Sequence, residues 1–296
     1  MACLFSPDDA LDRAQFSASI TALLDLAGIP HPLDVLRAPE LVPRFGRGKM
    51  RLHVESLRTQ VKAILDGRRA RPSVGGEADF LTLLMRAGAE DGAPLGDDVI
   101  VDNLLTFIAA GHETTARSLA WTLWLLSQAP DVERALQEEI AAAPLAATPP
   151  ERWTDVTPLL QATIKESMRL YPPAPHIARE CVERDVVGDL VIEPGTEVHM
   201  SPWLLHRQEG LWSAPETFRP RRFLEGEPAD RFAYLPFGVG PRVCIGASFS
   251  MQEMTIVLAT LLGAFRFRDR GETPPVPVLR VTLQPTTPIM MAAEAR

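Results

Sequence analysis

The sequence predicts a mainly α-helical protein with a small β region. Apolar residues recur at three- and four-residue spacing through most of the chain, which is the helical period. One segment, about residues 178–200, instead has strand-forming residues divided by a Pro194-Gly195 turn. A hydrophobic content of 46% against 23% charged residues is typical of a globular protein with a sizeable core. The sequence shows no internal repeat and no low-complexity linker, so we expect a single domain over residues 1–296.

The first helices are predicted within residues 1–75, and a longer one follows. Residues 92–130 give one exceptionally long helix, with Asp97 or Asp98 capping its start and Pro130 ending it. Some thirty residues at about 1.5 Å each cover roughly 45 Å, enough to cross a domain. The segment is apolar on nearly every face, so we expect it to be buried, yet a polar patch, residues 111–115, lies in its middle. The shorter predicted elements before it are helices at 18–29, 52–70 and 78–87 and a loop at 71–76.

After the long helix, the order is a helical part, the β region and a second helical part. The predicted elements are amphipathic helices at 131–143 and 156–170, the β region, a loop rich in proline and arginine at 207–236, a helix at 247–265 and an extended tail at 273–292.

Charge and cysteine content exclude several classes of protein. A net charge of −8 argues against nucleic-acid binding, which needs a concentrated basic face. The three cysteines, Cys3, Cys181 and Cys244, are scattered and odd in number, so we expect no disulfide framework and a reducing compartment. No apolar run approaches the ~18 residues of a membrane span, and the first residues lack the regions of a signal peptide. We therefore predict a cytoplasmic protein with no membrane segment.

The segment FGVGPRVCIG, residues 237–246, surrounds Cys244 with three glycines. The glycines permit backbone angles and close approaches that a side chain would forbid. A position just before a helix N-terminus favours a thiolate over a thiol. No second Cys or His lies nearby, so a tetrahedral zinc site has no support. A haem iron needs only one strong protein ligand, because the porphyrin supplies four, and a cysteine thiolate is one of the known ligands.

This segment allows two other interpretations. The first is a buried structural cysteine in a glycine-rich turn. The second is a dinucleotide-binding G-x-G-x-x-G loop, which we reject because Val243 stands where the third glycine belongs and proline occupies position 241.

The pattern Phe237-x-x-Gly240-x-Arg242-x-Cys244-x-Gly246 resembles the haem-binding signature of the cytochrome P-450 monooxygenases, of the bacterial soluble type. The resemblance implies haem b (iron protoporphyrin IX), with Cys244 as the ligand of the iron. The other cofactor-binding residues that it implies are Phe237, Gly238 and Gly246 in the signature, Arg242 and Arg179 on the haem propionates, and His206 near the same carboxylates.

Two further segments resemble parts of the same family. Glu166 and Arg169 are three residues apart on a predicted helix and share a face, a spacing that by itself usually marks a solvated pair. The family completes this pair with an arginine from an F-x-P-x-R-F segment, which here is residues 218–223 and supplies Arg222. The resemblance implies a buried structural network of Glu166, Arg169 and Arg222, without a catalytic role.

The polar patch in the long helix, Ala110-Gly111-His112-Glu113-Thr114-Thr115, resembles the family's oxygen-activation motif. It implies that Glu113 and Thr114 relay protons through water, and that Gly111 lets the helix open locally. The alternative is a threonine that only hydrogen-bonds its own helix. A zinc-protease motif is excluded because Ala116 replaces the second histidine.

The activity implied by the resemblance is insertion of one oxygen atom from O₂ into a mostly apolar small organic substrate. Electrons would come from NAD(P)H only indirectly, through a ferredoxin or flavin-type reductase, since the sequence has no nucleotide-binding motif. Arginines such as Arg231 would meet an acidic donor. Pocket positions suggested by the resemblance are Phe107, Ala110, His176, Ile177 and Thr287.

The chain departs from the family at its start. Every match lies between about residue 50 and the C-terminus, and nothing matches the N-terminal portion of the family fold, including its W-x-x-x-R helix. We therefore expect an N-terminally truncated fold. Three interpretations stay open: a fragment or misplaced start of an ordinary monooxygenase, a naturally short haem-thiolate protein, or a non-catalytic haem-binding or partner-binding remnant. Loss of one wall of the pocket would expose apolar surface.

Overall fold

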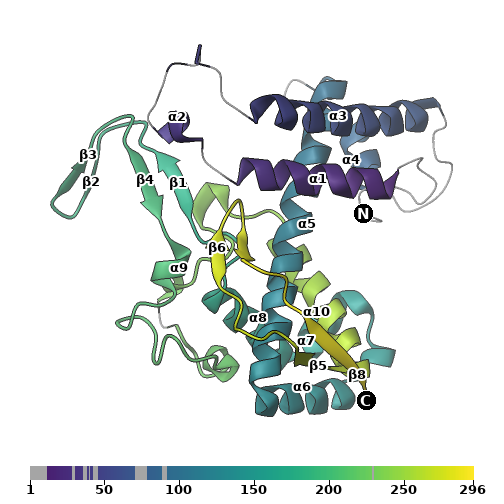
Figure 1. The fold of residues 1–296 in the computed structure, drawn as a ribbon, viewed down its shortest axis with the longest axis vertical. Helices are drawn as coiled ribbons and strands as arrows, with labels where there is room; N and C mark the ends of the chain where they lie inside the picture. Colours follow the sequence, from purple (N-terminus) through teal and green to yellow (C-terminus); the bar gives the residue numbers. More distant parts are fainter. Residues whose placement is uncertain are drawn as a thin grey trace. The chain divides into compact units, whose positions relative to one another are not determined.

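The computed structural model describes residues 12–28, 31–35, 39, 41–42, 46–70, 79–88, 92–228 and 230–296. They form two compact units, the first ending at Glu113 and the second beginning at Thr114. The division falls inside the longest helix, α5, which spans Asp97–Gln128 (Figure 1). Helices dominate and the sheets are small, so the predicted fold class, mainly α with little β, is confirmed.

The regular elements in the described part of the first unit are all helices, apart from one isolated β-bridge between Gly88 and Pro94. Asp12 and Asp79 cap two of its helices, because their carboxylates accept hydrogen bonds from the backbone N–H of Gln15 and Thr82 at 3.0 and 2.9 Å. Its core is made of aliphatic side chains around Phe16, which is fully buried. The loop predicted at 71–76 and Cys3 lie outside the described residues. The helices are α1 (Arg13–Ala27), α2 (Pro32–Val35), α3 (Arg47–Ala70), α4 (Phe80–Arg86) and the first part of α5.

The second unit contains the remaining helices, packed on the last part of α5. Pro130 does end the long helix, and it also begins the next one. A proline is tolerated at the first position of a helix, because the N–H that it lacks would have no hydrogen-bond partner within the helix. The core of this unit joins Leu126 of α5 to buried residues of three further helices, among them Leu136, Ile164 and Leu258. These helices are α6 (Pro130–Ala142), α7 (Trp153–Val156), α8 (Pro158–Leu170), α9 (Pro202–Leu205) and α10 (Ala247–Ala264).

Five 3₁₀ turns connect elements of the second unit. They are η1 (Leu145–Ala147), η2 (Pro150–Arg152), η3 (Pro220–Phe223), η4 (Arg231–Ala233) and η5 (Gly240–Arg242). Three of them lie in the loop rich in proline and arginine and in the cysteine segment, so these parts are locally ordered.

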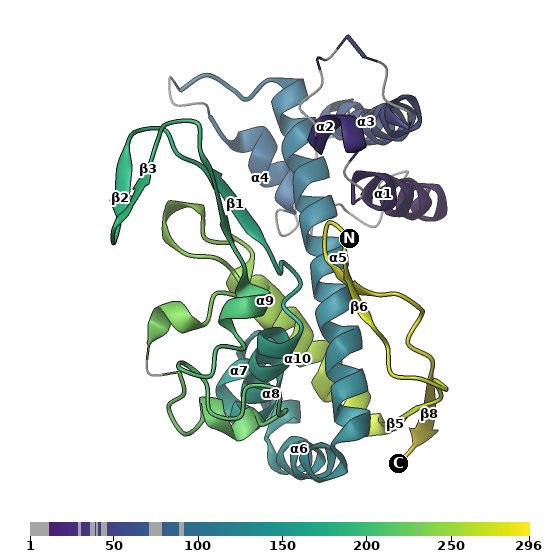
Figure 2. The ribbon, with the colours of Figure 1, turned by 60° about the vertical axis from the view of Figure 1, so that its left-hand side comes forward.

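The β structure consists of two-stranded antiparallel sheets in the second unit. The β region predicted at 178–200 forms two of them: a pair of strands that continues into a hairpin (Figures 1 and 2). The tail, predicted only as extended, supplies strands for two more. The pairs are β1 (Ile177–Glu180) with β4 (Glu197–Met200), β2 (Asp185–Val187) with β3 (Leu190–Ile192), β5 (Phe265–Asp269) with β8 (Met291–Ala295), and β6 (Pro277–Leu279) with β7 (Leu283–Pro285).

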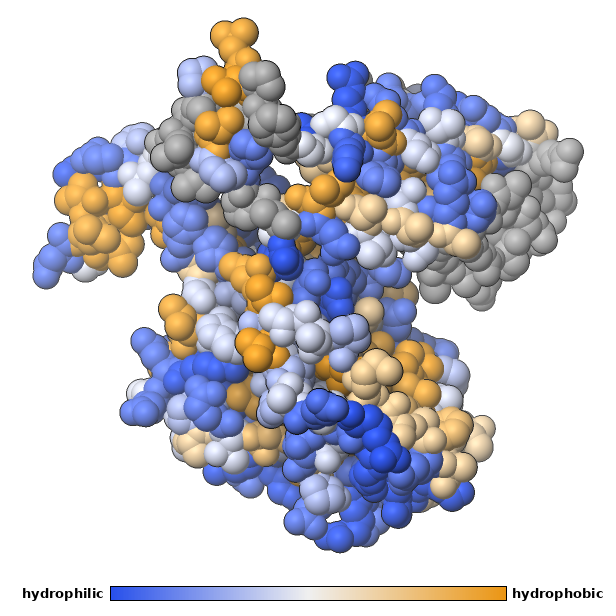
Figure 3. Space-filling model, in the orientation of Figure 1, coloured by the Kyte–Doolittle hydropathy of each residue, from blue (hydrophilic) through white to orange (hydrophobic). Residues whose placement is uncertain are grey.

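The β2–β3 hairpin exposes apolar side chains. Val187 and Leu190, which flank its turn, are 61% and 65% exposed. In the space-filling view the hairpin carries a hydrophobic surface (Figure 3).

Helix α10 has the length and composition of a membrane-spanning helix, with a mean hydropathy of 1.2 over its 18 residues. The expectation that no apolar run reaches this length is therefore wrong for α10. One such helix is weak evidence for a membrane span, since the core helix of a soluble protein passes the same test. Met254, Leu258 and Leu262 of α10 are fully buried in the core of the second unit.

Helix α5 differs from its prediction in two ways. It is unbroken from Asp97 to Gln128, so the local opening expected at Gly111 is not present. It is also not buried on nearly every face, because Ala110, Gly111 and His112 are exposed. The small side chains of Ala110 and Gly111 leave the helix backbone close to the surface here.

Candidate haem-thiolate site

The cysteine segment is a bent loop that leads from η5 into α10. The backbone N–H of Cys244 donates to the carbonyl of Phe237 at 2.8 Å, which closes the loop on itself. Gly238 and Gly240 have φ of 72° and 76°, left-handed values that side-chain-bearing residues rarely adopt. A methyl group added at either position would meet no atom closer than 3.9 Å. Glycine is therefore required at these two positions by the backbone conformation. The other reason that the sequence offered, close approach of another protein atom, does not apply at either position.

Cys244 has a free and exposed thiol. It lies two residues before Gly246, the N-cap of α10, as the sequence predicted. Apolar side chains beside it are also exposed: Val243 by 53%, Ile245 by 85% and Phe249 by 54%. This site offers one metal ligand, the thiol, within an apolar surface. It therefore fits a flat, largely apolar group whose metal already has its other ligands. Haem has this chemistry, because the porphyrin supplies four nitrogens. The described residues contain no group of three or more His, Cys, Asp or Glu side chains able to hold a metal ion.

Glu166, Arg169 and Arg222 meet in the second unit, with all three side chains fully buried. Arg169 donates from Nε and Nη2 to the two carboxylate oxygens of Glu166, at 2.8 and 3.0 Å. Arg222, from η3, donates to Glu166 Oε1 at 3.1 Å. The backbone N–H of Arg219 donates to the same oxygen at 2.8 Å, so Glu166 joins α8 to the loop that contains η3.

The remaining donors of the two arginines are also satisfied. Arg222 Nη1 donates to Glu227 Oε2 at 2.6 Å, so Arg222 is bonded to the carboxylates of both Glu166 and Glu227. Burial by itself would raise the pKa of Glu227, but hydrogen bonds from Ser213 and Arg222 lower it overall. The guanidinium group of Arg169 lies 5.2 Å from the ring centroid of Trp212. Buried charges that are balanced and fully hydrogen-bonded in this way stabilise one arrangement of the loop. Sequence reasoning missed Glu227 and Trp212, since nothing in their spacing relates them to Glu166.

His206 is fully buried, at the end of α9. Its Nδ1 donates to the carbonyl of Arg169 at 3.2 Å, and its Nε2 accepts the backbone N–H of Leu235 at 2.9 Å. Burial lowers the pKa of His206 to about 4, which keeps the ring neutral. Both ring nitrogens are thus used by the backbone, and neither remains for a cofactor carboxylate. The structure places His206 as a link between α8 and Leu235, two residues before the cysteine segment, in contrast to the predicted cofactor contact.

The polar patch of α5 has one contact that sequence reasoning did not find. Glu113 is buried and Thr114 half-buried, while the hydroxyl of Thr115 lies 3.2 Å from that of Ser250 on α10. Ser250 is in the first turn of the helix that follows Cys244, because its N–H donates to the carbonyl of Gly246 at 2.8 Å. The turn of α5 that begins at Thr114 is therefore adjacent to the helix that the cysteine loop enters.

The other predicted cofactor contacts lie in the second unit. Arg242 in η5 and Arg179 in β1 are exposed, and Arg179 Nη1 donates to the neighbouring carbonyl of Ala178, at 2.8 Å. Phe237 packs against the core of this unit. The aromatic ring anchors the start of the loop, while the two guanidinium groups face solvent.

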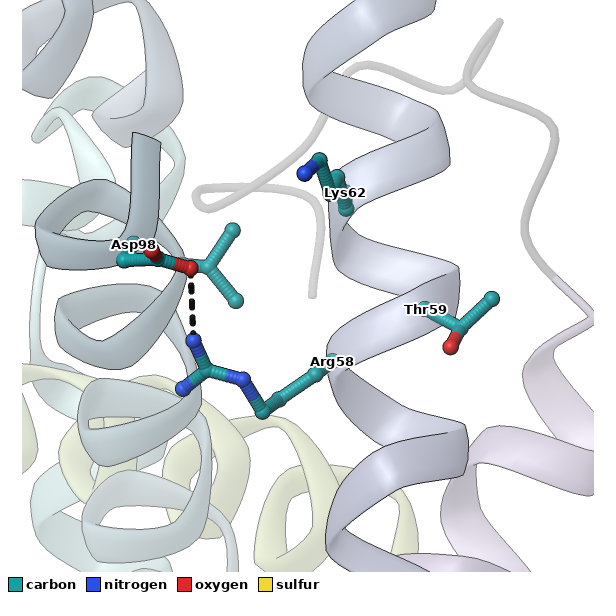
Figure 4. A pocket seen from close by; sticks show the side chains of 5 residues that line it. Arg58, Thr59, Lys62 and Asp98 are labelled. Carbon is teal, nitrogen blue, oxygen red and sulfur yellow. Dashed lines mark hydrogen bonds and ion pairs between the residues drawn. The ribbon is translucent and has the colours of Figure 1, made fainter. Parts of the chain in front are cut away.

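A small pocket of about 200 Å³ lies in the first unit (Figure 4). An ion pair crosses it, because Arg58 Nη2 lies 2.8 Å from Asp98 Oδ1. Phe107, predicted as a substrate-pocket position, packs against Phe80, with the ring centroids 4.4 Å apart. The residues that line the pocket are Arg58, Thr59, Lys62, Asp98 and Val101, and none of them is a predicted site residue.

The loop, the free thiol and the buried Glu-Arg-Arg network together define a protein of the haem-thiolate class. The family model for cytochrome P450 matches residues 3–292. The chain therefore belongs to the cytochrome P450 family, as the sequence motifs predicted.

Individual relatives give the same result. Putative cytochrome P450 137 of Mycobacterium tuberculosis is 34% identical over 273 residues, which are 92% of this chain and 54% of that protein. Cyclooctatin synthase of Streptomyces melanosporofaciens is 35% identical over 75% of this chain and 49% of its own length. Cytochrome P450 3A12 of the dog, Canis lupus familiaris, is 35% identical over 74% of this chain and 45% of its own. The chain thus spans about half the length of the curated relatives it matches.

Proposed function

We propose that this chain is a haem-thiolate monooxygenase in which the sulfur of Cys244 binds the iron of haem b. The observation that supports this most directly is the free, exposed thiol of Cys244 amid apolar surface, at the end of a loop bent by two left-handed glycines. Family membership implies haem as the cofactor. The single-domain organisation over residues 1–296 and a cytoplasmic location belong to the same proposal.

The proposed cofactor contacts come from the cysteine loop and from β1. Arg242 and Arg179 are exposed guanidinium groups of the kind that bind carboxylates, and we assign them to the haem propionates. Phe237, Gly238 and Gly246 line the loop around the sulfur. His206 is left out of this set, because its two ring nitrogens already bond the backbone.

When bound, haem activates O₂ so that one oxygen atom enters the substrate and the other leaves as water. The role that we assign to this chain's residues is delivery of protons. The carboxyl group of Glu113 holds a proton and the hydroxyl of Thr114 passes it on through water, since a positioned acid typically contributes about 10²–10⁴-fold to rate. The two residues are adjacent on one unbroken helix, where neighbouring side chains do not face each other, so the water between them completes the relay.

The substrate and the electron donor complete the proposal. We assign a mostly apolar small organic substrate, with Ala110, His176, Ile177 and Thr287 among the contacts. Electrons come from NAD(P)H through a ferredoxin or flavin-type reductase. Arg231 in η4 is exposed and offers a cationic contact to an acidic donor.

A second candidate is a haem-binding or partner-binding chain without catalysis. The observation that favours it is that α5 is unbroken at Gly111, without the local opening that the oxygen-activation motif implies. This candidate predicts haem uptake, or partner binding, without oxygen insertion.

The deciding experiment is a carbon monoxide difference spectrum of the purified chain after haem reconstitution. Thiolate ligation by Cys244 gives the red-shifted reduced band that this ligand produces. Cys244→Ser removes that band, whereas Cys181→Ser, the matched control at the other described cysteine, keeps it. Absence of the band in the unmodified chain, or its persistence in Cys244→Ser, would refute the assignment of the sulfur. If the band forms but no substrate is oxidised, the non-catalytic candidate is favoured.

A further inference from the structure

Two histidines converge on one face of the β1–β4 sheet. Nε2 of His176 lies 2.7 Å from Nδ1 of His199, and the ring centroids are 4.8 Å apart. Both side chains are exposed to solvent. His176 immediately precedes β1 and His199 lies in β4, so 23 residues of chain separate the two rings.

The strand register explains the convergence. Ala178 of β1 pairs with His199 of β4. His176 is two residues before Ala178, so it lies on the same face of the sheet as Ala178 and is a diagonal neighbour of His199. Long or aromatic side chains at diagonal positions can touch, and here the two imidazole rings contact each other.

A carboxylate lies on the far side of His199. Glu197 is two residues earlier in β4 and shares the same face, and its Oε2 lies 3.7 Å from Nε2 of His199. A carboxylate at this position favours a proton on Nε2, which leaves the lone pair of Nδ1 directed at His176. Histidines that bind metals in proteins are commonly oriented by a carboxylate in this manner.

We propose that His176 Nε2 and His199 Nδ1 form a binding site for a divalent transition-metal ion, with Glu197 as the residue that orients His199. The two metal–nitrogen bonds of about 2.0–2.1 Å require the nitrogens to lie roughly 2.9–3.3 Å apart, a small widening of the present pair. The proton now shared between the rings moves to Nδ1 of His176, so each imidazole binds as a neutral ligand. Water fills the remaining positions.

Two imidazole nitrogens as ligands favour particular divalent transition metals. Imidazole suits copper, nickel and zinc, and copper(II) binds most tightly in the general order of divalent ions. His176 is also a proposed substrate contact, but neither histidine is a proposed haem ligand. The inference does not depend on the proposed monooxygenase function, because the metal is bound by the two imidazoles without haem or substrate.

The test is a calorimetric titration of nickel chloride into the tag-free full chain after removal of bound metal by a chelator. Nickel is chosen because it prefers imidazole and does not oxidise the thiols. The expected result is one nickel ion per chain. His176→Asn and His199→Asn each abolish that binding, and Glu197→Gln weakens it by roughly 10-fold.

The matched control is His112→Asn, which replaces an exposed histidine on α5 and leaves nickel binding unchanged. Circular dichroism and the thermal midpoint of each variant establish that it is folded, as expected for exposed positions. The proposal is overturned if the unmodified chain binds no nickel. It is equally overturned if either His176→Asn or His199→Asn binds nickel within twofold of the unmodified chain.

Discussion

The hydroxyl oxygens of Thr115 and Ser250 lie 3.2 Å apart and join α5 to α10. Thr115 is buried and follows Thr114 directly, and Ser250 is one turn beyond Gly246. The polar patch of α5 and the cysteine loop carry the family motifs. The contact between Thr115 and Ser250 therefore connects the polar patch to the first turn of the helix that follows the cysteine loop. This side-chain hydrogen bond favours the observed packing of α5 on α10 at this level.

Replacing either hydroxyl should lower stability by about 1 kcal/mol, the usual net value of one hydrogen bond. The variants are Thr115→Val and Ser250→Ala, with the double variant to complete a cycle. Because the two groups bond each other, the double variant should lose less than the sum of the single losses. Urea unfolding measures all three. Additive losses would show that the hydroxyls are not coupled.

Glu166→Gln should be strongly destabilising, by about 3–5 kcal/mol, because it leaves two buried arginines without their shared carboxylate. That is a large part of the total stability of about 5–15 kcal/mol of a typical protein. The control is Asp131→Asn, which breaks an exposed pair with Arg134 and should cost no more than about 1 kcal/mol. Urea unfolding followed by tryptophan fluorescence makes the comparison.

If the Glu166→Gln protein does not accumulate in folded form, Glu227→Gln tests the same network of buried charges. The Glu227 side chain is 27% exposed, so water replaces part of what Arg222 loses, and a smaller cost of about 2 kcal/mol is expected. A loss within experimental error for Glu227→Gln would argue against a balanced four-charge network.

The neutral His206 should make the fold sensitive to acid. Its pKa is about 4 in the folded chain, below the ordinary histidine value of 6.5 that applies to the unfolded chain. Between these values the unfolded chain binds a proton that the folded chain does not, so the free energy of unfolding falls as the pH is lowered. The contribution is fully present above about pH 6.5 and is lost as the pH falls towards 4, for a total of about 3 kcal/mol.

His206→Gln isolates this contribution. A glutamine side chain offers an acceptor to the N–H of Leu235 but does not titrate. Between pH 7 and pH 4.5, most of the titration is complete, so the stability of the unmodified chain should fall by about 2 kcal/mol more than that of the variant. Parallel pH profiles, measured by urea unfolding, would contradict a buried neutral histidine.

Thr114→Ala tests the proposed proton relay. With haem reconstituted and a ferredoxin–reductase pair supplying electrons, the variant should divert O₂ to peroxide, so that product formed per NAD(P)H falls. Thr106→Ala is the matched control, because Thr106 is an exposed threonine of the same helix whose hydroxyl donates to the carbonyl of Asp102. The ratio of product to NAD(P)H consumed is the measurement. Equal ratios with product formed in Thr114→Ala and Thr106→Ala would contradict the relay role of Thr114, whereas no product from any of the three proteins would favour the non-catalytic candidate.

Local sequence determined the features that depend on neighbouring residues. The spacing of apolar residues predicted the helices, and three-residue spacing put Glu166 and Arg169 on one face of α8. Gly238 and Gly240 marked a bend, because only glycine adopts their positive φ without strain. The motif around Cys244 identified the family that the comparisons then established.

Tertiary structure alone decided burial and the contacts between distant segments. The apolar composition of α5 on nearly every face predicted a buried helix, yet Ala110 to His112 are exposed, because burial depends on which other segments cover a face. The family motif predicted a cofactor contact for His206, which is instead neutral and fully buried between backbone groups. The pair of His176 and His199 could be found only from the register of β1 on β4. Residue spacing along one element is fixed by backbone geometry, whereas contacts across elements are fixed by how their side chains pack, which no local pattern encodes.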